Sequence, residues 1–426
     1  MAGLVRGTIG AMSTVTEAQV QADVTAWLAQ NWDRERPLGE WRMLLADSGW
    51  AVASWPEDWH GRGLPSWADR VVASAINDAD AVGPPLGSGI SLAAPTILAH
   101  GSDELKRRVL YPTITGEVSW CQLFSEPGAG SDLAGLSTTA VRDGDDWIVN
   151  GQKVWNTSAH HADYAMLVAR TDWSVPKHQG ISYFVLPMHQ PGVEVRPIVQ
   201  MNCHESFNEV FLADARIPAA NIVGQPGEGW RAARTTLMHE RTFSTLRGSR
   251  RTLVSGRAQI EAEAEAEAEE YFKVYAWYPQ RGGRSELAIP RAQQHGVSGH
   301  PILRQELAAL YSFTKANEWT AKRALAARSL GRPPGPEGSL GKLARSEVAR
   351  RSALAHTRIS GAAAMLAAGT GHHDDVAAEI LISTPAQSIA GGTDEIQRNI
   401  IGENILGLPR EPSADRDQPF SEVRRS

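Results

Sequence analysis

Hydrophobic spacing changes twice along this chain of 426 residues, and those two changes constrain its fold more than any other feature. Apolar residues recur at helical spacing in the first third, as at Val20, Val24 and Leu28. From about Trp120, short β-branched runs separated by glycine or polar turns predict strands. Helical spacing returns at Trp230, after a glycine-rich linker. We therefore predict an α+β multidomain fold with a helical domain at 1–118, a β domain at 119–229 and a helical domain at 230–426.

The charge balance and the apolar stretches argue against several classes of protein. With 42 Lys and Arg against 48 Asp and Glu, the net charge of −6 gives no general attraction to nucleic acid or to an anionic membrane. The longest small-apolar stretch, Gly361–Gly369, is far shorter than the ~20 residues that cross a bilayer. The N-terminus lacks a signal-peptide pattern, and Cys121 and Cys203 are too few for a disulfide framework. We expect a soluble, cytoplasmic protein with two core thiols, whose partners are small molecules or proteins.

Residues 261–270 read EAEAEAEAEE, a segment whose composition and pattern disagree. Strict alternation is typical of a strand, but Ala and Glu are strong helix formers. Acidic pairs four residues apart repel one another along such a helix. We predict an exposed helical extension here.

The stretch Phe124–Asp132 is the first candidate for a binding site. It contains a proline and two glycines directly after an apolar strand, a composition that lets backbone amides and hydroxyls approach a ligand closely. We interpret it as a ligand-binding loop, and a tight structural turn is the alternative. The start of Gly128–Leu133 is similar to a dinucleotide fingerprint, but Leu133 occupies the place of the third glycine. His204–Asn208 has Asn in place of the second His of a zinc pair, so we expect no metal site.

A second candidate follows the Asn150-Gly151 hairpin signal. Trp155 and Thr157 stand two residues apart on a predicted strand, so they share one face. An indole against a flat heteroaromatic ring, with a hydroxyl at the ring edge, suits a flavin. The alternative is that Trp155 belongs to the core.

Four motifs, in this order along the chain, resemble the acyl-CoA dehydrogenase family over nearly the whole sequence. They are Ser125–Asp132, Asn150–Thr157, Phe207–Leu212 with Ala215–Pro218, and Gly392–Arg398. The resemblance implies a middle domain that is β-barrel-like and a C-terminal four-helix bundle. It also implies FAD as the cofactor, an acyl-CoA substrate and an electron-transfer flavoprotein as the partner that accepts the electrons.

The resemblance implies roles for individual residues as well. Cofactor-binding residues would be Phe124, Ser125, Gly130, Ser131, Trp155, Thr157, Thr393 and Glu395, with Ser131 also near the acyl-CoA. Arg291 begins an altered form of the family's Arg-x-x-Phe-Gly element and is the expected counterpart in flavin binding. Gly361–Gly371 lacks the glutamine and paired glycines that receive a neighbouring subunit's flavin in the family.

The catalytic base departs from the commonest family pattern. Many relatives carry a glutamate at the position of Gly391, which cannot accept a proton. Another branch, which includes isovaleryl-type and long-chain enzymes, places its base on a bundle helix just before an arginine. Glu240 and Arg241 stand at that place, so the resemblance implies Glu240 as the base and Arg241 as a substrate contact. Independently of the resemblance, Glu240 lies on a largely apolar face of the predicted helix. The residues of this face are Trp230, Ala233, Leu237, Glu240 and Ser244. The alternative is that Glu240 pairs with an arginine inside the bundle.

The implied reaction is FAD-dependent α,β-desaturation of an acyl-CoA thioester in fatty acid or lipid metabolism. Glu240 would remove the α-proton while the β-hydrogen leaves as hydride to flavin N5. The space left at Ala390–Gly392 suggests a branched or bulky acyl group. The resemblance further implies a homotetramer or heterotetramer. Two rivals stay open: a catalytically silent structural subunit of a hetero-oligomeric acyl-CoA dehydrogenase, and a flavin oxidase or monooxygenase on the same fold.

Overall fold

The computed structural model describes residues 15–243, 258–329, 335–365, 375–412 and 415–423. Their contacts form two compact units. One contains the described residues of Met1–Ser119 and Gly248–Glu269, and the other contains those of Trp120–Arg247 and Glu270–Ser426. Within the described ranges, no helix combines the length and the apolar character needed to cross a membrane. The predicted boundary between a β domain and a C-terminal helical domain at residues 229 and 230 falls inside the second unit and stays a prediction.

The first unit is helical, as its spacing predicts. Its helices are α1 (Glu17–Asn31), α2 (Leu38–Asp47), α3 (Ala68–Asp78), α4 (Ala94–His100) and α5 (Asp103–Thr115). Thr16 caps α1 by accepting a hydrogen bond from the Gln19 amide at 3.2 Å, a common start for a helix. Trp41 is completely buried, and its ring lies 4.8 Å from that of Trp32. This aromatic contact lies in the core of the first unit.

The alternating segment forms a helix, but it is not an exposed extension. Ile260, the second residue of helix α7 (Gln259–Lys273), is 0% exposed in the core of the first unit. The Glu267 carboxylate lies 2.6 Å from the Arg42 guanidinium, and Glu263 accepts a hydrogen bond from the Leu38 amide at 2.7 Å. The prediction of an exposed extension is wrong because these partners stand more than 200 residues earlier in the sequence, where local spacing cannot find them.

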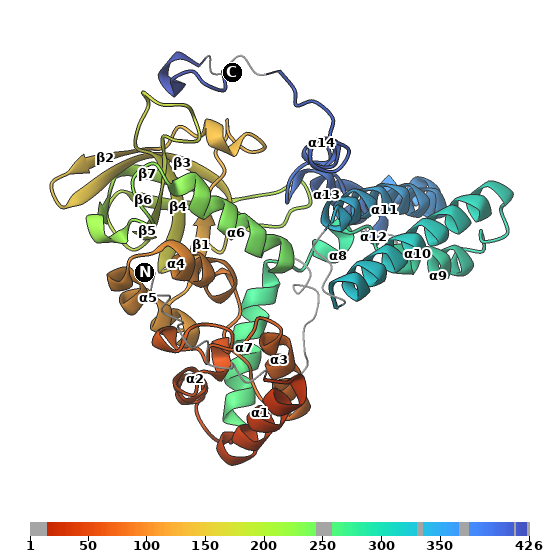
Figure 1. Cartoon of the computed structure of the whole chain (residues 1–426). Helices are drawn as coiled ribbons and strands as arrows, with labels where there is room; N and C mark the ends of the chain where they lie inside the picture. Colours follow the sequence, from red (N-terminus) through yellow and green to blue (C-terminus); the bar gives the residue numbers. More distant parts are fainter. Residues whose placement is uncertain (1–14, 244–257, 330–334, 366–374, 413–414, 424–426) are drawn as a thin grey trace, which may run out of the picture. The chain divides into compact units, whose positions relative to one another are not determined.

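The second unit begins with a curled sheet of seven strands (Figure 1). The strands are β1 (Trp120–Leu123), β2 (Thr139–Asp143), β3 (Asp146–Thr157), β4 (Tyr164–Arg170), β5 (Ile181–Pro187), β6 (Val193–Ile198) and β7 (Phe207–Pro218). They are ordered β1-β4-β2-β3-β7-β6, with β5 paired to β4. Most neighbours are antiparallel, whereas β1 and β2 each run parallel to β4. The inward-facing side chains form one apolar core, which includes Leu123, Val149, Leu167, Leu186 and Ile217.

The two cysteines differ in their surroundings. Cys121 in β1 is 1% exposed, and burial raises the pKa of its thiol far above the ordinary value. Cys203 is exposed in a turn, with a φ of +62°. The prediction of a core thiol is confirmed for Cys121 and wrong for Cys203, because the turn that precedes β7 projects outward.

Helices complete the second unit. They are α6 (Gly229–Phe243), α8 (Tyr278–Arg281), α9 (Ser285–Gln294), α10 (Pro301–Ser329), α11 (Glu337–Ser360), α12 (Asp375–Ser383), α13 (Pro385–Ile389) and α14 (Asp394–Asn404). Helices α10 and α11 lie side by side, and α9, α12 and α14 also pack against α11 (Figure 1). Helix α6 instead packs against β5. The predicted fold class is confirmed, with a helical N-terminal part, a curled sheet and a helical C-terminal part.

Replacing Ile260 by Ala tests whether α7 belongs to the first unit. Because Ile260 is fully buried, Ile260→Ala should lower the free energy of unfolding by about 2–5 kcal/mol. Urea unfolding followed by circular dichroism measures this loss. The matched control is Val141→Ala, whose side chain is 63% exposed and should contribute little. An equally small decrease in the free energy of unfolding in both variants would indicate that α7 is a surface extension.

Candidate functional site

The loop that follows β1 leaves open space beside its backbone. Glu126 and Ala129 exchange two backbone hydrogen bonds, at 3.0 and 3.1 Å, which close the start of the loop. A Cβ atom added to Gly128 or Gly130 would meet no atom within 4 Å, and neither glycine has a positive φ. The glycines are therefore needed neither for a left-handed turn nor for tight packing. This geometry favours a ligand-binding loop over a purely structural turn.

A buried ion pair ties this loop to β3. Lys153 is 0% exposed, and its Nζ lies 2.8 Å from Oε1 of Glu126. The same ammonium donates to the Phe124 carbonyl at 3.0 Å. The Glu126 carboxylate also accepts the backbone amides of Ser137 at 2.6 Å and Thr138 at 2.9 Å. One cation and one carboxylate thus join three segments: the loop, strand β3 and the residues that lead into β2.

The surroundings keep this carboxylate ionised. Burial alone would raise the pKa of Glu126, but the charge of Lys153 and the hydrogen bonds from Lys153, Thr138 and Ser137 bring it below its ordinary value. Burial lowers the pKa of Lys153, and the Glu126 carboxylate opposes that shift. Each charge is therefore tolerated because the other is present.

Strand β3 carries the second predicted motif and is irregular there. A bulge lies between Lys153 and Asn156, where the pairing with β7 shifts its register. Trp155 sits in this bulge with a φ of +64° and is 57% exposed, with its ring edge-on to Phe207 at 5.7 Å. Asn156 is buried, whereas Thr157 is half-buried. The alternative that Trp155 is a core residue is wrong.

The loop residues differ in how accessible they are. Phe124 is buried, with its ring edge-on to Tyr183 at 5.9 Å, so its side chain belongs to the core. The Ser125 carbonyl accepts a hydrogen bond from the Val154 amide at 2.9 Å, which fixes the loop beside β3. Gly130 and Ser131 are exposed. A ligand can reach the second half of the loop and the indole of Trp155, but not the ring of Phe124.

Helix α6 carries Glu240 on the side that packs against the sheet. A Cβ atom added to Gly229 would lie 2.3 Å from the backbone of Ser182 in β5, so only glycine permits this approach. Thr236 is fully buried, and its hydroxyl lies 3.1 Å from that of Tyr183. Glu240 follows Thr236 by four residues and therefore lies on the same face, one turn further along.

The surroundings of Glu240 are partly apolar. The side chain of Glu240 is half-buried, and within the described part of the chain it has no ion-pair partner. Burial lowers the pKa of the neighbouring His239 below its ordinary value. The side chain of Arg241 and Ser244 of the predicted apolar face lie outside the described residues. The other residues of this face are buried or half-buried, as predicted.

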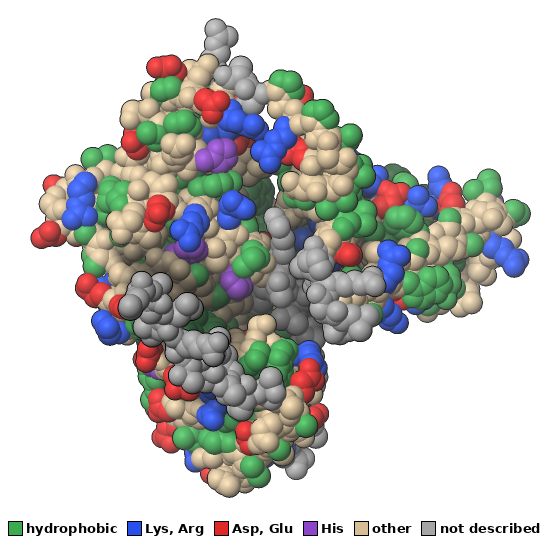
Figure 2. All heavy atoms as spheres, in the orientation of Figure 1, with side chains coloured by type: hydrophobic (Ala, Val, Ile, Leu, Met, Phe, Trp, Pro, Cys, Tyr) green, Lys and Arg blue, Asp and Glu red, His purple; other side chains and the backbone are tan. Residues whose placement is uncertain are grey.

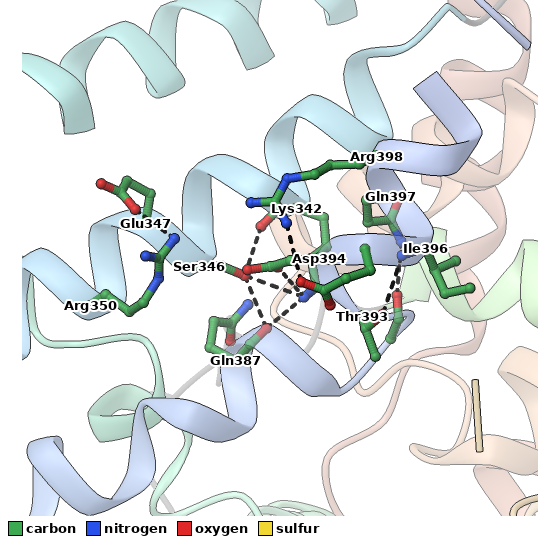
Figure 3. A network of polar contacts seen from close by, with 12 residues as sticks. Lys342, Ser346, Glu347, Arg350, Gln387, Thr393, Asp394, Ile396, Gln397 and Arg398 are labelled. Atoms are coloured by element: carbon green, nitrogen blue, oxygen red, sulfur yellow. Dashed lines mark hydrogen bonds and ion pairs between the residues drawn. The ribbon is translucent and has the colours of Figure 1, made fainter. Parts of the chain in front are cut away.

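The last motif is anchored by a second buried lysine. Figure 3 shows Lys342 and Ser346 of α11 pointing toward Asp394, the first residue of α14. The Lys342 ammonium lies 3.0 Å from the Asp394 carboxylate and donates to the Gln387 carbonyl at 2.7 Å. Burial opposes ionisation of Asp394, but hydrogen bonds from Ser346 and Lys342 lower its pKa below the ordinary value. This network fixes where α14 begins.

The remaining predicted residues make their described side-chain contacts within the C-terminal helices. Thr393 caps α14 by accepting from the Ile396 amide at 3.2 Å, and Glu395 pairs with Arg398 at 3.2 Å on the surface. Arg291 in α9 is 8% exposed, and its guanidinium donates to His356 at 2.8 Å and to Ser360 at 3.0 Å. Burial lowers the pKa of His356, which favours the neutral ring that this bond requires. The role of these residues in flavin binding stays a prediction.

The structure brings the predicted residues into two groups. Lys153 joins the loop to β3, the strand that carries Trp155 and Thr157. Thr236, one turn before Glu240 on α6, meets Tyr183, whose ring contacts Phe124 at the start of the loop. The predictions omit Lys153 and Glu126, which hold the first group together. Two features of the sequence could have identified them: Lys153 lies within a strand segment, and Glu126 comes soon after the apolar strand that ends at Leu123. A charged residue that a strand buries requires a partner of opposite charge.

Comparisons with known proteins agree on one family. Three family models match in chain order: "Acyl-CoA dehydrogenase, N-terminal domain" at residues 11–117, "middle domain" at 121–214 and "C-terminal domain" at 285–406. Acyl-CoA dehydrogenase IpdE1 of Mycobacterium tuberculosis is 36% identical over 92% of this chain and 98% of its own length. Short-chain specific acyl-CoA dehydrogenase of Mus musculus is 28% identical over 87% of this chain and 82% of its own length.

Two solved complexes are similar over almost the whole chain. The ChsE4-ChsE5 complex from Mycobacterium tuberculosis has a TM-score of 0.61 at 25% identity, covering 94% of this chain and 100% of its own. The Tcur3481-Tcur3483 steroid ACAD has a TM-score of 0.63 at 24% identity, covering 93% of this chain and 98% of its own.

Replacing Lys153 by Met tests the buried ion pair. The change leaves the Glu126 carboxylate buried without its cation. Lys153→Met should therefore lower the free energy of unfolding of the second unit by about 3–5 kcal/mol in a denaturant titration. The double variant Lys153→Met with Glu126→Gln should regain part of this loss, because it buries no unpaired charge. Lys273→Met, at a side chain that is 76% exposed, serves as the control and should leave stability unchanged. A double variant no more stable than Lys153→Met would contradict the charge argument.

Proposed function

The chain belongs to the acyl-CoA dehydrogenase family, and on this premise we propose that it desaturates an acyl-CoA thioester between its α and β carbons with FAD as cofactor. The family match covers all three parts of the chain in order. The finer proposal concerns the residues that carry the reaction. The observation that supports it best is the position of Glu240 on α6, one turn beyond Thr236, whose hydroxyl meets that of Tyr183 beside Phe124 of the loop.

The residues of the β domain fit a flavin. The exposed indole of Trp155 offers an aromatic face for a planar ring system, and Thr157 on the same strand offers a hydroxyl. Open space beside Gly128 and Gly130 lets the loop amides approach a polar group. Phe124 and Ser125 would hold the loop against the β domain, while Gly130 and Ser131 would contact the ligand. When bound, FAD supplies the acceptor for the β-hydrogen, which leaves the substrate as hydride.

Glu240 is proposed as the base. Its carboxylate would take the α-proton of the thioester as the carbon–carbon double bond forms, and a half-buried position on a packed helix face would hold it in place. Arg241 and Ser131 would contact the substrate. Gly391 and Gly392 have φ values of +71° and +84°, a backbone region that disfavours a side chain such as glutamate. This conformation supports a base on α6 rather than beside the last motif.

Gly391 supports a bulky acyl group. A Cβ atom added to Gly391 would meet nothing within 4 Å, so the space beside it is open. The similar Tcur3481-Tcur3483 structure is that of a steroid ACAD, which fits an acyl group that contains rings. We therefore place a branched or ring-containing acyl-CoA ahead of short straight-chain substrates.

A tetramer is proposed for the assembly, either of one chain or of two. Helix α10 exposes large apolar side chains: Ile302 at 65%, Trp319 at 65% and Leu325 at 64%. Their separations of 17 and 6 residues place them on different faces of the helix, so they form no continuous patch, and the tetramer is proposed from the family resemblance. Figure 2 shows acidic and basic side chains interspersed over the face that it displays, without a single large patch of one sign. An electron-transfer flavoprotein as electron acceptor and a cytoplasmic location stay predictions.

The alternative of a silent subunit rests on one observation. The two similar solved complexes, ChsE4-ChsE5 and Tcur3481-Tcur3483, each pair two differently named chains, so this chain could serve as a structural partner to an active one. A flavin monooxygenase has less support, because that reaction does not need Glu240. A flavin oxidase would use the same base and would differ in passing the electrons to O₂.

Glu240→Gln tests the base, because it keeps the shape of the side chain and removes its basicity. The rate of anaerobic flavin reduction by acyl-CoA should fall roughly 10²–10⁴-fold, while FAD and acyl-CoA still bind. Stopped-flow absorbance of the flavin band measures this rate. Glu205→Gln, at an exposed acid of the same unit, is the matched control and should reduce at the wild-type rate. Unchanged reduction in Glu240→Gln would refute the assignment, whereas a wild type that binds FAD but is not reduced would favour the silent subunit.

A substrate panel tests the bulky acyl group. We expect kcat/KM for a ring-containing acyl-CoA to exceed that for butyryl-CoA by roughly 10-fold or more, a range that apolar pocket contacts can supply. Ala390→Leu should fill part of the space and reduce the ratio. Preference for butyryl-CoA in the wild type would count against the proposal.

A further inference from the structure

The chain continues beyond the part that the C-terminal family model matches. That match ends at residue 406, whereas described residues 415–423 return to the β domain. The Phe420 amide donates to the Val175 carbonyl at 2.9 Å, and the Ser421 amide donates to the Trp173 carbonyl at 2.9 Å. Figure 1 shows this C-terminal segment, in dark blue, beside the strands. We call residues 415–423 the strap.

The strap is seated by one buried aromatic side chain. Phe420 is 3% exposed, and its ring centre lies 5.4 Å from that of Trp173. The guanidinium of Arg170, which is 0% exposed, lies 3.6 Å from the centre of the Phe420 ring. The attraction between a cation and an aromatic face is stronger where both are shielded from water. Phe420 therefore covers a charge that would otherwise meet water.

Arg170 connects the strap to the end of the ligand-binding loop. Its guanidinium donates to the carbonyls of Ala134 at 2.6 Å and Leu136 at 3.2 Å. It also donates to the Lys177 carbonyl at 3.0 Å. The strap, the segment between β4 and β5, and residues 134–136 thus share one buried cation.

Lys177 provides a second connection. Its ammonium lies 2.8 Å from the carboxylate of Asp132 and 3.9 Å from that of Asp415 in the strap. Asp132 directly follows Ser131. Lys153 and Glu126 hold the start of the loop, and Glu126 also accepts the amides of Ser137 and Thr138 beyond its end. Arg170 and Lys177 hold residues 132–136 between them.

We propose that the strap is a positioning element for acyl-CoA, with Phe420 fixing the loop end that presents Ser131 and Asp132 to the substrate. This inference rests on the proposed function. Because the start of the loop and Trp155 are held independently of the strap, loss of Phe420 should weaken acyl-CoA binding and leave flavin binding almost unchanged. A strap that merely stabilised the domain would alter both together.

The test compares three variants of the full-length protein. Phe420→Ala removes the ring, Phe420→Tyr keeps an aromatic face over Arg170, and Val149→Ala removes apolar volume from the core of the same sheet. We expect the KM for acyl-CoA to rise about 10-fold in Phe420→Ala, with kcat and the FAD dissociation constant within about 2-fold of wild type; such a rise corresponds to about 1.4 kcal/mol. Phe420→Tyr should restore the wild-type KM. Val149→Ala should lower the melting temperature without this selective change in KM.

Hydrogen exchange tests the contact of the strap with the loop, and the substrate kinetics separate failure of this inference from failure of the proposed function. In protein without substrate, amides in residues 130–136 and 171–179 should exchange faster in Phe420→Ala than in wild type. An unchanged KM in Phe420→Ala, or an equal rise in Val149→Ala, would overturn the strap's role while leaving the proposed reaction intact. A wild type that neither binds nor turns over acyl-CoA would overturn the proposed function and this role with it, whatever the exchange rates.

Discussion

The ion pair between Lys153 and Glu126 is the constraint on which the rest of the candidate site depends. A completely buried ammonium is costly unless a carboxylate and further acceptors surround it. Here the acceptors are Glu126 and the Phe124 carbonyl, so β3 must lie against the loop after β1. The carboxylate in turn accepts hydrogen bonds from the backbone amides of Ser137 and Thr138. Directly after Lys153 the strand bulges, and Trp155 is turned toward solvent.

The C-terminal motif follows the same physical principle on a helical scaffold. Lys342 is buried beside Asp394, as Lys153 is buried beside Glu126. In both places the motif's own acid is used for anchoring inside the protein. Its neighbours remain accessible: Gly130 and Ser131 in the loop, and Glu395 at the start of α14. Motif residues therefore divide into those that hold the backbone and those that a ligand can reach, a distinction that the sequence motif does not contain.

The candidate site is assembled by packing as well as by charge. Helix α6 approaches β5 closely because Gly229 has no side chain, and Thr236 then bonds to Tyr183. Tyr183 in turn contacts Phe124 at the start of the loop. This series of contacts determines which face of α6 lies toward the sheet, and hence the side on which Glu240 lies. At the far end of the loop, Arg170 and Phe420 form a separate anchor that uses residues from the C-terminal segment.

Local spacing determined the α, β, α order and the existence of α7 as a helix, because helix and strand periods are properties of neighbouring residues. The predicted hairpin at Asn150-Gly151 is wrong: both residues lie inside β3, where the pairing with β7 shifts at Gly151, and the turn between β2 and β3 is at residues 144–145. The motifs located the loop and the Trp155 strand. Only the tertiary structure decided that α7 packs into the first unit, that Cys203 is exposed and that Phe420 covers Arg170. These outcomes depend on partners far away along the chain. A charge or an apolar side chain gains its stabilisation from the group it meets in space, and a sequence pattern contains no record of that group.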